Sequence, residues 1–456
     1  MGLLVVGLTA FPVFRGPQEH RGHGCCLSGS HMVRRLSVRS PRLQRARRPP
    51  PSAPPTTAPM DSPSPPPPPP YPPAAAEGGP AADSQAAELP RLTVTQVEQM
   101  KVEAKVGEIY RVLFGNAPNA NSLMLELWRE QHVEYLTRGL KHLGPSFHVL
   151  DANRPWLCYW IIHALALLDE IPDDVEDDIV DFLSRCQDKD GGYGGGPGQL
   201  PHLATTYAAV NTLVTIGSER ALSSGQPVQV HASDERYIGS FQVASLVNIL
   251  DGELAKGVKP MKVALLGNRM LKLMGWVAFR QGVECGFQGR TNKLVDGCYS
   301  FWQGAALALT QKLMTVVDEQ LKSSYSSKRP PGDDACGTSS STEAAYYAKF
   351  GFDFIEKSNQ IGPLFHNIAL QQYILLCAQV LDGGLRDKPG KNRDHYHSCY
   401  CLSGLSVSQY SAMVDSDACP LPQHVLGPYS NLLEPIHPLY NVVLDKYHTA
   451  YEFFSS

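Results

Sequence analysis

The sequence GFQGRTNKLVDGCYSFW occupies residues 286–302 and decides both the fold and the expected chemistry. It begins as a glycine-rich loop and runs into an apolar helical pattern that continues to residue 309. Two cations, a carboxylate, a thiol and a phenol lie within ten positions of it: Arg290, Lys293, Asp296, Cys298 and Tyr299. Backbone N–H groups at a helix start favour anions and thiolates. The stretch therefore predicts a binding site where a loop enters a helix.

The residue types in this loop divide into two sets. Arg290 and Lys293 suit an anionic ligand such as a phosphate, although two cations on a loop are as often only solvated. Asp296 and Cys298 suit a divalent metal of the zinc type, whereas a lone cysteine is more often a buried apolar thiol. Taken together, the two sets predict chemistry between a phosphorylated substrate and a sulfur nucleophile.

The glycine-rich loop recurs along the chain. One copy spans residues 186–198, the second 284–289 and the third 382–390, and each precedes an apolar helix that carries an aromatic residue. Helical spacing begins near residue 94, and strand signals are few. The pattern predicts an all-α domain of stacked helical hairpins. The copies lie almost 100 residues apart, so intermediate copies exist or have been lost.

The overall composition limits the classes of function. The chain has 456 residues and a net charge of -4, so no basic field indicates a nucleic-acid partner. Its 11 cysteines are mostly scattered through apolar segments, which is typical of free thiols in a reducing compartment. No apolar run reaches membrane-spanning length. We therefore expect a cytoplasmic protein without stable membrane insertion.

The first part of the chain differs in composition from the rest. Residues 1–93 are rich in proline and arginine and predict a disordered extension before a domain at 94–456. Their arginine-rich part resembles an organelle transit segment, but translated upstream sequence, with Met60 as a second start, is favoured. Residues near 317–357 are rich in serine, lysine and glycine and predict a polar insertion. Residues 218–242 lack a helical period.

The glycine repeats and three longer motifs closely resemble the β subunits of protein farnesyltransferases. The motifs are the loop at 286–302, DHYHSCYCLSG at 394–404 and RPWLCYW at 154–160. The resemblance covers about residues 94–440 and is nearest to plant members. It implies an α/α toroid of helical hairpins that pairs with an α subunit. It also implies transfer of farnesyl from farnesyl diphosphate to the cysteine of a C-terminal CaaX motif in a protein substrate.

The resemblance assigns the polar site residues. It makes Asp296, Cys298 and His397 the ligands of one zinc ion, and three mixed ligands leave a coordination position open for the substrate thiolate. It makes Arg290, Lys293 and Tyr299 the diphosphate-holding set, with Mg²⁺ accompanying the diphosphate. We assign the nearby Cys399 and Cys401 to packing.

The resemblance also assigns a lined cavity. Six aromatic residues form its wall: Trp156, Trp160, Tyr207, Trp302, Tyr396 and Tyr400. Stripes of this kind are usually ordinary core, but these residues flank the metal motif. His202 is implied as a contact to the protein substrate. Bulky Trp156 and Tyr400 favour the farnesyl enzyme over the β subunit of geranylgeranyltransferase type I, which is the alternative.

A second candidate motif has an ordinary explanation. The sequence DDVED at 173–177 fits the DDxxD pattern by which terpene synthases bind diphosphate through Mg²⁺. It follows Pro172 and opens a helix that ends near Arg185. Acids in a first helical turn are routine because they match the helix dipole. We therefore expect a surface helix start at this position.

One repeat of the family has no counterpart in this chain. The family carries a repeat of the type Glu-Ala-His-Gly-Gly-Tyr-Thr-Phe-Cys, whose histidine holds the diphosphate. Here the match runs through residues 243–250 and resumes at residues 275–277. About one hairpin is missing, so we expect a disordered or distorted sector between about residues 218 and 274. The alternative to a catalytic subunit is a non-catalytic variant that binds an α subunit without turnover.

Overall fold

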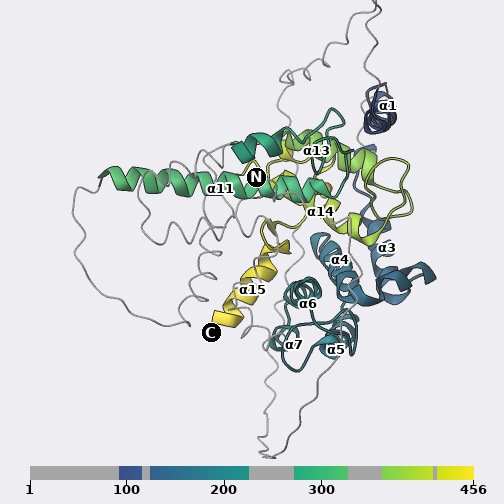
Figure 1. Cartoon of the computed structure of the whole chain (residues 1–456), viewed down its shortest axis with the longest axis vertical. Coiled ribbons are helices and arrows are strands. Elements are labelled where there is room, and N and C mark those ends of the chain that lie inside the picture. The colour runs from purple at the N-terminus through teal and green to yellow at the C-terminus, as the bar shows by residue number, and fades with distance from the viewer. Residues whose placement is uncertain (1–91, 116–123, 225–271, 327–361, 414–418, 456) are drawn as a thin grey trace, which may run out of the picture. The chain divides into compact units, whose positions relative to one another are not determined.

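The computed structural model describes residues 92–115, 124–224, 272–326, 362–413 and 419–455, which belong to one unit of the chain (Figure 1). Almost all of the predicted extension at 1–93 lies outside these residues. The helices and strands are, in chain order, α1 (Val94–Gly115), α3 (Arg129–Lys141), the 3-10 helix η1 (Pro145–Asn153), α4 (Arg154–Leu167), α5 (Glu176–Cys186), α6 (Leu203–Ile216), α7 (Glu219–Ser224), α11 (Tyr299–Ser326), α13 (Asn367–Tyr373), the π-helical turn η2 (Ile374–Ala378), α14 (His395–Tyr410), the short 3-10 turns η3 (Pro422–His424) and η4 (Tyr429–Asn431), β1 (Ile436–His437), β2 (Val442–Val443) and α15 (Leu444–Ser455).

Helices dominate the described part of the chain. The named strands there form a single two-stranded antiparallel ribbon, in which Ile436 lies opposite Val443. This agrees with the predicted all-α class, because period-two apolar patterns are scarce in the sequence.

The three glycine-rich loops have the same local structure. Each has two isolated β-bridges, and the first lies at the same place in all three loops: Gln187 with Tyr193, Gln281 with Phe287, and Gln379 with Leu385. The loops lead into α6, α11 and α14, as the repeated pattern predicts. The repetition in sequence is therefore a repetition of structure.

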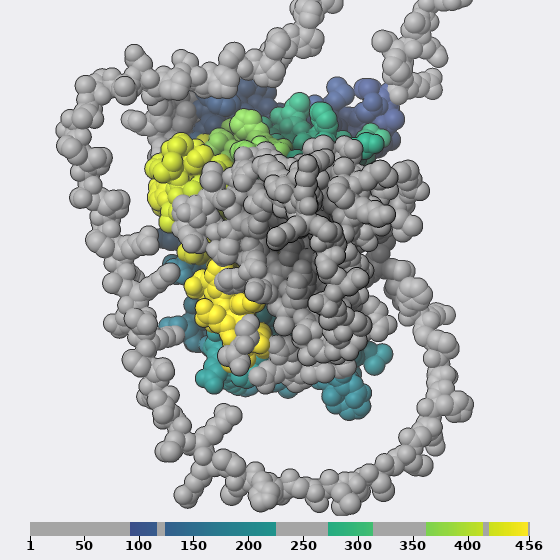
Figure 2. Space-filling view, turned by 90° about the vertical axis from the view of Figure 1, so that its left-hand side faces the viewer, coloured from purple at the N-terminus to yellow at the C-terminus, as the bar shows by residue number. Residues whose placement is uncertain are grey.

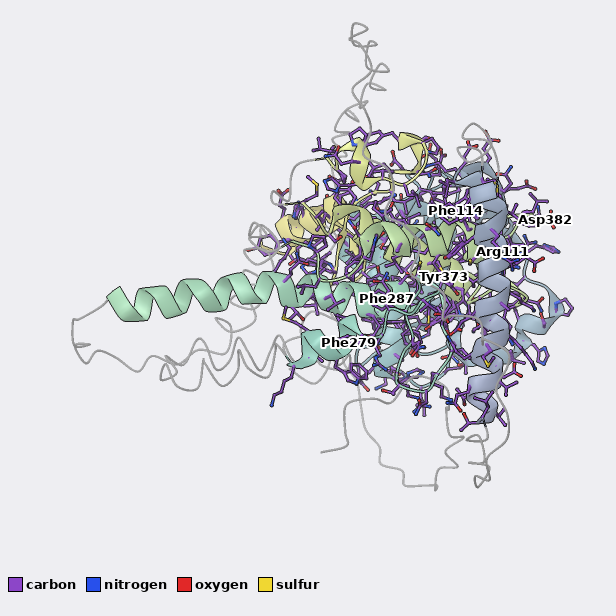
Figure 3. All side chains as sticks on the ribbon, turned by 90° about the horizontal axis from the view of Figure 1, so that it is seen from above. Arg111, Phe114, Phe279, Phe287, Tyr373 and Asp382 are labelled. Atoms are coloured by element: carbon purple, nitrogen blue, oxygen red, sulfur yellow. The ribbon has the colours of Figure 1, made fainter. Side chains whose placement is uncertain are left out.

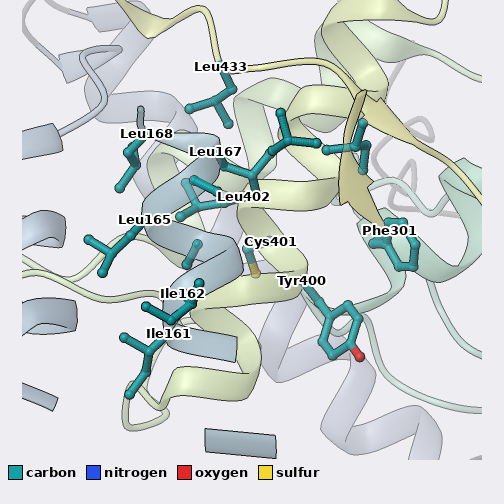
Figure 4. Close-up of a cluster of buried hydrophobic side chains, with 14 of the residues drawn as sticks. Ile161, Ile162, Leu165, Leu167, Leu168, Phe301, Tyr400, Cys401, Leu402 and Leu433 are labelled. Atoms are coloured by element: carbon teal, nitrogen blue, oxygen red, sulfur yellow. The ribbon is translucent and has the colours of Figure 1, made fainter. Parts of the chain in front are cut away.

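A shared apolar layer joins helices that are distant in sequence. Helix α4 packs against α3, α6 and α14, and α14 packs against α11 and α13. Figure 4 shows Ile161, Ile162 and Leu165 of α4 beside Leu402 of α14, all almost fully buried. Burial of each such side chain contributes about 1.5–3 kcal/mol before entropy is counted. This layer holds α4, α11 and α14 rigidly, so the side chains at the ends of these helices are held in place as well.

Helix α1 supports the second glycine loop from outside (Figure 3). Val102 and Val106 of α1 pack against Val295 and Tyr373. The Tyr110 hydroxyl donates a 2.8 Å hydrogen bond to the carbonyl of Glu284. Val295 directly precedes Asp296, so α1 contributes to the placement of the candidate metal loop.

Two predictions about irregular segments were partly wrong. Helix α11 continues to Ser326, ten residues into the predicted insertion at 317–357, because residues 317–322 are mostly good helix formers. The segment at 218–242, which lacks a helical period in sequence, starts with helix α7. The Ser218 hydroxyl accepts a hydrogen bond from the Ala221 N–H at the start of this helix. Residues 272–278 are also helical, and the rest of both segments, 225–271 and 327–361, lies outside the described residues.

The acid-rich segment at 173–177 precedes and opens a helix, as expected. Helix α5 carries Glu176, Asp177 and Asp178 in its first turn. Asp177 and Asp181 form ion pairs with Arg220 of α7 across the surface. These pairs explain the acids without a bound diphosphate.

The C-terminal helix α15 follows the β1–β2 ribbon and is visible in yellow on the face seen in Figure 2. No helix among the described residues is both long enough and apolar enough to cross a bilayer.

Candidate functional site

The loop before α11 holds Asp296 and Cys298 through backbone hydrogen bonds. The Asp296 N–H donates to Phe287 O at 3.1 Å, and the Gly297 N–H donates to Asp387 O at 2.7 Å. A Cβ at Gly297 would lie 2.6 Å from Sγ of Cys401, so a larger residue at this position would push the two glycine loops apart. The Cys298 N–H donates to Asp296 Oδ1 at 2.9 Å. The third glycine loop therefore fixes the second at the site.

The first turn of α14 orients His397. Asp394 is the N-cap of this helix, and its Oδ1 accepts the His397 N–H at 2.7 Å. Its Oδ2 lies 2.7 Å from His397 Nδ1. This contact favours the tautomer with the proton on Nδ1 when the ring is neutral, which frees the Nε2 lone pair for a metal. His397 Nε2 lies 3.3 Å from Asp296 Oδ1.

The predicted ligand set converges in space. Donor atoms of Asp296, Cys298 and His397 all lie within 4.8 Å of one another, although His397 follows Cys298 by almost 100 residues. Cys298 is buried and the other two side chains are half-buried. One carboxylate oxygen, one sulfur and one imidazole nitrogen suit zinc and leave a coordination position open.

The metal-free site holds protons that a cation would replace. Burial opposes the charged form of His397, but hydrogen bonds to Asp296 and Asp394 raise its pKa to about 9. Burial opposes the charge on Asp296 as well, yet the His397 imidazolium lowers the pKa of this carboxyl. Burial and the Asp296 charge raise the pKa of the Cys298 thiol well above its usual value. Without metal, the site is therefore an imidazolium held by two carboxylates beside a protonated thiol, and metal binding must release protons.

The predicted anion-binding residues lie on the same loop. Arg290 and Lys293 are exposed to solvent, where their charges remain available to a ligand. Tyr299 follows Cys298 at the start of α11, and its ring lies so close to Gly289 that a Cβ there would overlap it. Burial and the nearby Cys298 and Asp296 raise the pKa of Tyr299 to about 12. The phenol is therefore a neutral hydrogen-bond donor at neutral pH.

The six predicted aromatic residues form one continuous contact path. Ring centroids lie 5.7 Å apart for Tyr207 and Trp156, 5.6 Å for Trp156 and Trp160, and 5.5 Å for Trp160 and Tyr396. The path continues from Tyr396 to Tyr400 at 4.8 Å and from Tyr400 to Trp302 at 4.6 Å. Tyr396 also contacts the ring of His397 at 5.0 Å. These six residues, defined as the aromatic wall, thus contact the candidate metal ligand His397 through Tyr396, which lies within the path.

An apolar cavity of about 400 Å³ opens beside this wall. Trp160 and Tyr396 belong to both, and Phe147, Leu150 and Leu157 line the rest of its apolar surface. A cavity of this size accommodates part of a hydrocarbon chain or an apolar side chain.

His202 lies apart from these contacts. It is exposed at the N-cap position of α6, and no ring contact joins it to the aromatic wall within the described part of the chain. Cys399 and Cys401 are fully buried, and neither belongs to the three-residue donor cluster.

Sequence reasoning missed the residues that support the site. Asp394 could have been found, because an aspartate three positions before a histidine at a helix start is a common capping pattern. Tyr159 and Asn441, which hold one end of the aromatic wall, lie 282 residues apart and have no local signature.

Comparison with known proteins places the chain in a family. A family model described as "Prenyltransferase alpha-alpha toroid domain" matches residues 127–245 and 240–442. The protein farnesyltransferase subunit beta of Pisum sativum is 47% identical over 443 aligned positions, covering 82% of this chain and 99% of the pea protein. The chain belongs to the protein farnesyltransferase β-subunit family. The α/α-toroid class predicted from the sequence is thereby confirmed.

Other relatives show that this chain is more similar to farnesyltransferase β subunits than to a geranylgeranyl transferase type-1 β subunit. The Arabidopsis thaliana farnesyltransferase subunit beta is 41% identical and covers 80% of this chain. The geranylgeranyl transferase type-1 subunit beta of the same plant is 26% identical and covers 52% of this chain and 40% of its own length. Among solved structures, Candida albicans protein geranylgeranyltransferase-I complexed with GGPP matches 71% of this chain and 98% of that chain, with a TM-score of 0.34 and 15% identity. The sequence relatives alone favour the farnesyltransferase group.

The alignment with the pea farnesyltransferase subunit also shows that this chain lacks residues at some of the aligned positions. The alignment runs over 443 positions, but 82% of this chain is only about 374 of its 456 residues. At least about 70 aligned positions therefore have no residue of this chain opposite them. The two matched segments of the family model meet at residues 240–245, next to the place where the motif pattern breaks. The size of the deficit agrees with the loss of a repeat.

Proposed function

We propose that this chain is a zinc-dependent β subunit that pairs with a farnesyltransferase α subunit and prenylates CaaX proteins. It would transfer farnesyl from farnesyl diphosphate to the cysteine of the CaaX motif. The observation that carries the proposal is the convergence of Asp296, Cys298 and His397 beside the aromatic wall. A soft metal site beside an apolar surface suits a thiol and an isoprenoid in contact.

The reaction joins the sulfur of the substrate to C1 of the farnesyl group. The C–S bond forms as the C1–O bond breaks, the thiol proton is lost, and diphosphate leaves with the bonding electrons. Zinc held by Asp296, Cys298 and His397 would keep the substrate thiol as a thiolate at neutral pH. Arg290, Lys293 and the neutral phenol of Tyr299 would bind the diphosphate and stabilise its growing charge, and Mg²⁺ would accompany it.

The aromatic wall would hold the isoprenoid and exclude water from the reacting atoms. Its rings offer broad apolar surfaces and few rotatable bonds, so binding orders few side chains. His202, exposed near the wall-bearing helix α6, would contact the protein substrate.

The proposal includes a cytoplasmic heterodimer. Val94, Met100 and Phe114 of α1 are 56–81% exposed, and exposed apolar residues of this size on one helix are typical of a protein interface. The cysteines among the described residues are free thiols, which fits a reducing compartment.

The test of the proposal is co-expression of the full chain with a plant farnesyltransferase α subunit. We expect about one zinc per heterodimer and transfer of labelled farnesyl to a CaaX-terminated peptide. A heterodimer without zinc, or without affinity for farnesyl diphosphate, would refute the proposal.

A second candidate is a non-catalytic subunit that binds an α subunit without turnover. The deficit of about 70 aligned positions favours it, because a lost repeat would remove a donor to the diphosphate. Zinc and farnesyl diphosphate binding without transfer would identify this function.

Trp156→Thr should shift the substrate preference toward the longer geranylgeranyl diphosphate. Removal of the indole opens volume at the wall, and differences of a few methylene groups are worth about tenfold or more in selectivity. The affinity ratio for the two diphosphates, measured by equilibrium dialysis, checks this. Trp276→Thr, at a tryptophan outside the wall, should leave the ratio unchanged.

Asp394→Asn should weaken zinc binding by about 10–100-fold, because a carboxylate hydrogen-bonded to a ligating imidazole orients it and raises its basicity. The asparagine oxygen still caps α14, so the helix start is retained. Competition with a chromophoric zinc chelator measures the affinity. Asp382→Ala, an exposed aspartate of the preceding loop, is the control and should bind zinc normally.

A further inference from the structure

The β1–β2 ribbon ends in a tight turn that is buried among helices. Asn441 follows this turn with a φ of 52°, a left-handed conformation that asparagine tolerates better than most residues. Its N–H donates to His437 O at 2.9 Å and closes the turn. Asn441 is only 1% exposed and therefore lies inside the protein, whereas Tyr440 before it is half-buried.

Two successive carbonyl groups at this tip accept side chains from two helices. Tyr440 O accepts the Tyr207 hydroxyl at 2.9 Å and the Asn211 amide at 3.0 Å, both from α6. Asn441 O accepts the hydroxyl of Tyr159, on α4, at 2.7 Å. The ribbon tip, defined as Tyr440 and Asn441, therefore connects α4 to α6.

The side chain of Asn441 ties the tip to α4 a second time. Its Oδ1 lies 3.0 Å from Nε2 of His163, which is fully buried and also lies 3.1 Å from the Ser403 hydroxyl. Burial lowers the pKa of His163 to about 3 despite the bond to Asn441, so the ring is neutral and can donate from Nε2. The ring centroids of His163 and Tyr159 lie 5.5 Å apart in a stacked arrangement, and this contact restricts the tyrosine ring.

Tyr159 and Tyr207, which the ribbon tip holds, pack against Trp156. The Tyr159 and Tyr207 rings lie 5.9 and 5.7 Å from the Trp156 ring and 5.8 Å from each other. These three residues pack in one apolar cluster, which Trp160 joins to the main core. Within this cluster, buried hydrogen bonds from the tip hold the hydroxyl groups of Tyr159 and Tyr207.

We infer that the ribbon tip is a positioning element that sets the isoprenoid chain length by holding Tyr159 and Tyr207 behind Trp156. This inference rests on the proposed function, since it assumes that Trp156 borders the isoprenoid. Tyr440 and Asn441 act through the tyrosines and do not touch the substrate. The tip fixes the wall at the end opposite the metal site, where the far end of an isoprenoid chain would lie.

The test uses the full chain paired with an α subunit and the variants Tyr159→Phe and Asn441→Gly. Tyr159→Phe removes one hydroxyl bond to the tip, and Asn441→Gly keeps the left-handed turn but removes the bond to His163. We expect each to reduce the ratio of affinities for farnesyl and geranylgeranyl diphosphate by about fivefold, the effect of one buried hydrogen bond. Equilibrium dialysis with labelled diphosphates gives the ratio, and zinc content and thermal unfolding show whether the chain is intact.

Tyr193→Phe is the matched control. Tyr193 is 1% exposed, and its hydroxyl has no hydrogen-bond partner among the described residues, so the variant loses a buried hydroxyl without losing a bond to the tip. Its affinity ratio should equal that of the unmodified chain. Ratios unchanged in Tyr159→Phe and Asn441→Gly, with farnesyl diphosphate still bound by the unmodified heterodimer, overturn the inference alone. Absence of binding by the unmodified heterodimer overturns the proposed function and the inference with it.

Discussion

Insertion of the His-Gly-Gly-Tyr repeat expected from the family pattern should raise farnesyl transfer by about 10²–10³-fold, because one donor to a developing oxyanion typically contributes that much to the rate. The inserted segment would be the His-Gly-Gly-Tyr hairpin of the family pattern, placed after residue 250 where the match of this chain to that pattern breaks. Arg290 and Lys293 lie on the repeat after this break, so their placement also depends on how the neighbouring repeats join. Single-turnover transfer to a CaaX peptide, measured with both chains paired to the same α subunit, gives the comparison.

A second inserted version separates the two causes of such a gain. In it the histidine of the new hairpin is replaced by alanine, so the repeat is complete but the donor is absent. A gain that persists in this version would assign the effect to packing of the repeats. Equal turnover of the original and the repaired chains would show that the fold tolerates the deletion and that the histidine has a counterpart elsewhere.

Cys298→Ser should abolish stable zinc binding, with a loss of affinity of about 100-fold or more, since a hydroxyl is a poor ligand for this metal and the donor cluster among the described residues has three members. Zinc per heterodimer after dialysis against a chelator is the measurement. Cys401→Ala is the matched control, because Cys401 is equally buried and lies one turn after His397 outside the donor cluster. Retention of zinc by Cys298→Ser would remove this residue from the ligand set.

The same site predicts a pH dependence with a definite sign. In the metal-free chain the raised pKa values leave His397 and Cys298 protonated near neutral pH. Zinc must displace these protons, so zinc affinity should increase as the pH rises toward about 9 and fall in acid. Calorimetric titrations in buffers of different ionisation enthalpy count the protons released.

The sequence by itself determined the repeated loops, the all-α class and the residue types of the site. Glycines at fixed places in each loop and the apolar helices that follow them are local features, and local features can be read from spacing. Asp296 and Cys298 were likewise visible together, because a single loop carries both. The extent of α11 was not visible, because the serine-rich composition of the segment hid the good helix formers at 317–322. The short helix α7 was not visible either, since its Arg220 pairs with Asp177 of another helix.

How these parts act together depends on contacts between helices that are distant in sequence. His397 reaches Asp296 because α14 packs against α11, and Asp394 then fixes the ring through its place at the helix start. The aromatic residues become a wall because α4, α6 and α14 meet, and its far end is held by carbonyl groups of Tyr440 and Asn441, more than 230 residues after Tyr207. A backbone carbonyl has the same chemistry at every residue, so no sequence pattern reveals which one a distant tyrosine will contact. That choice depends on packing between helices, which exists only once the chain is folded.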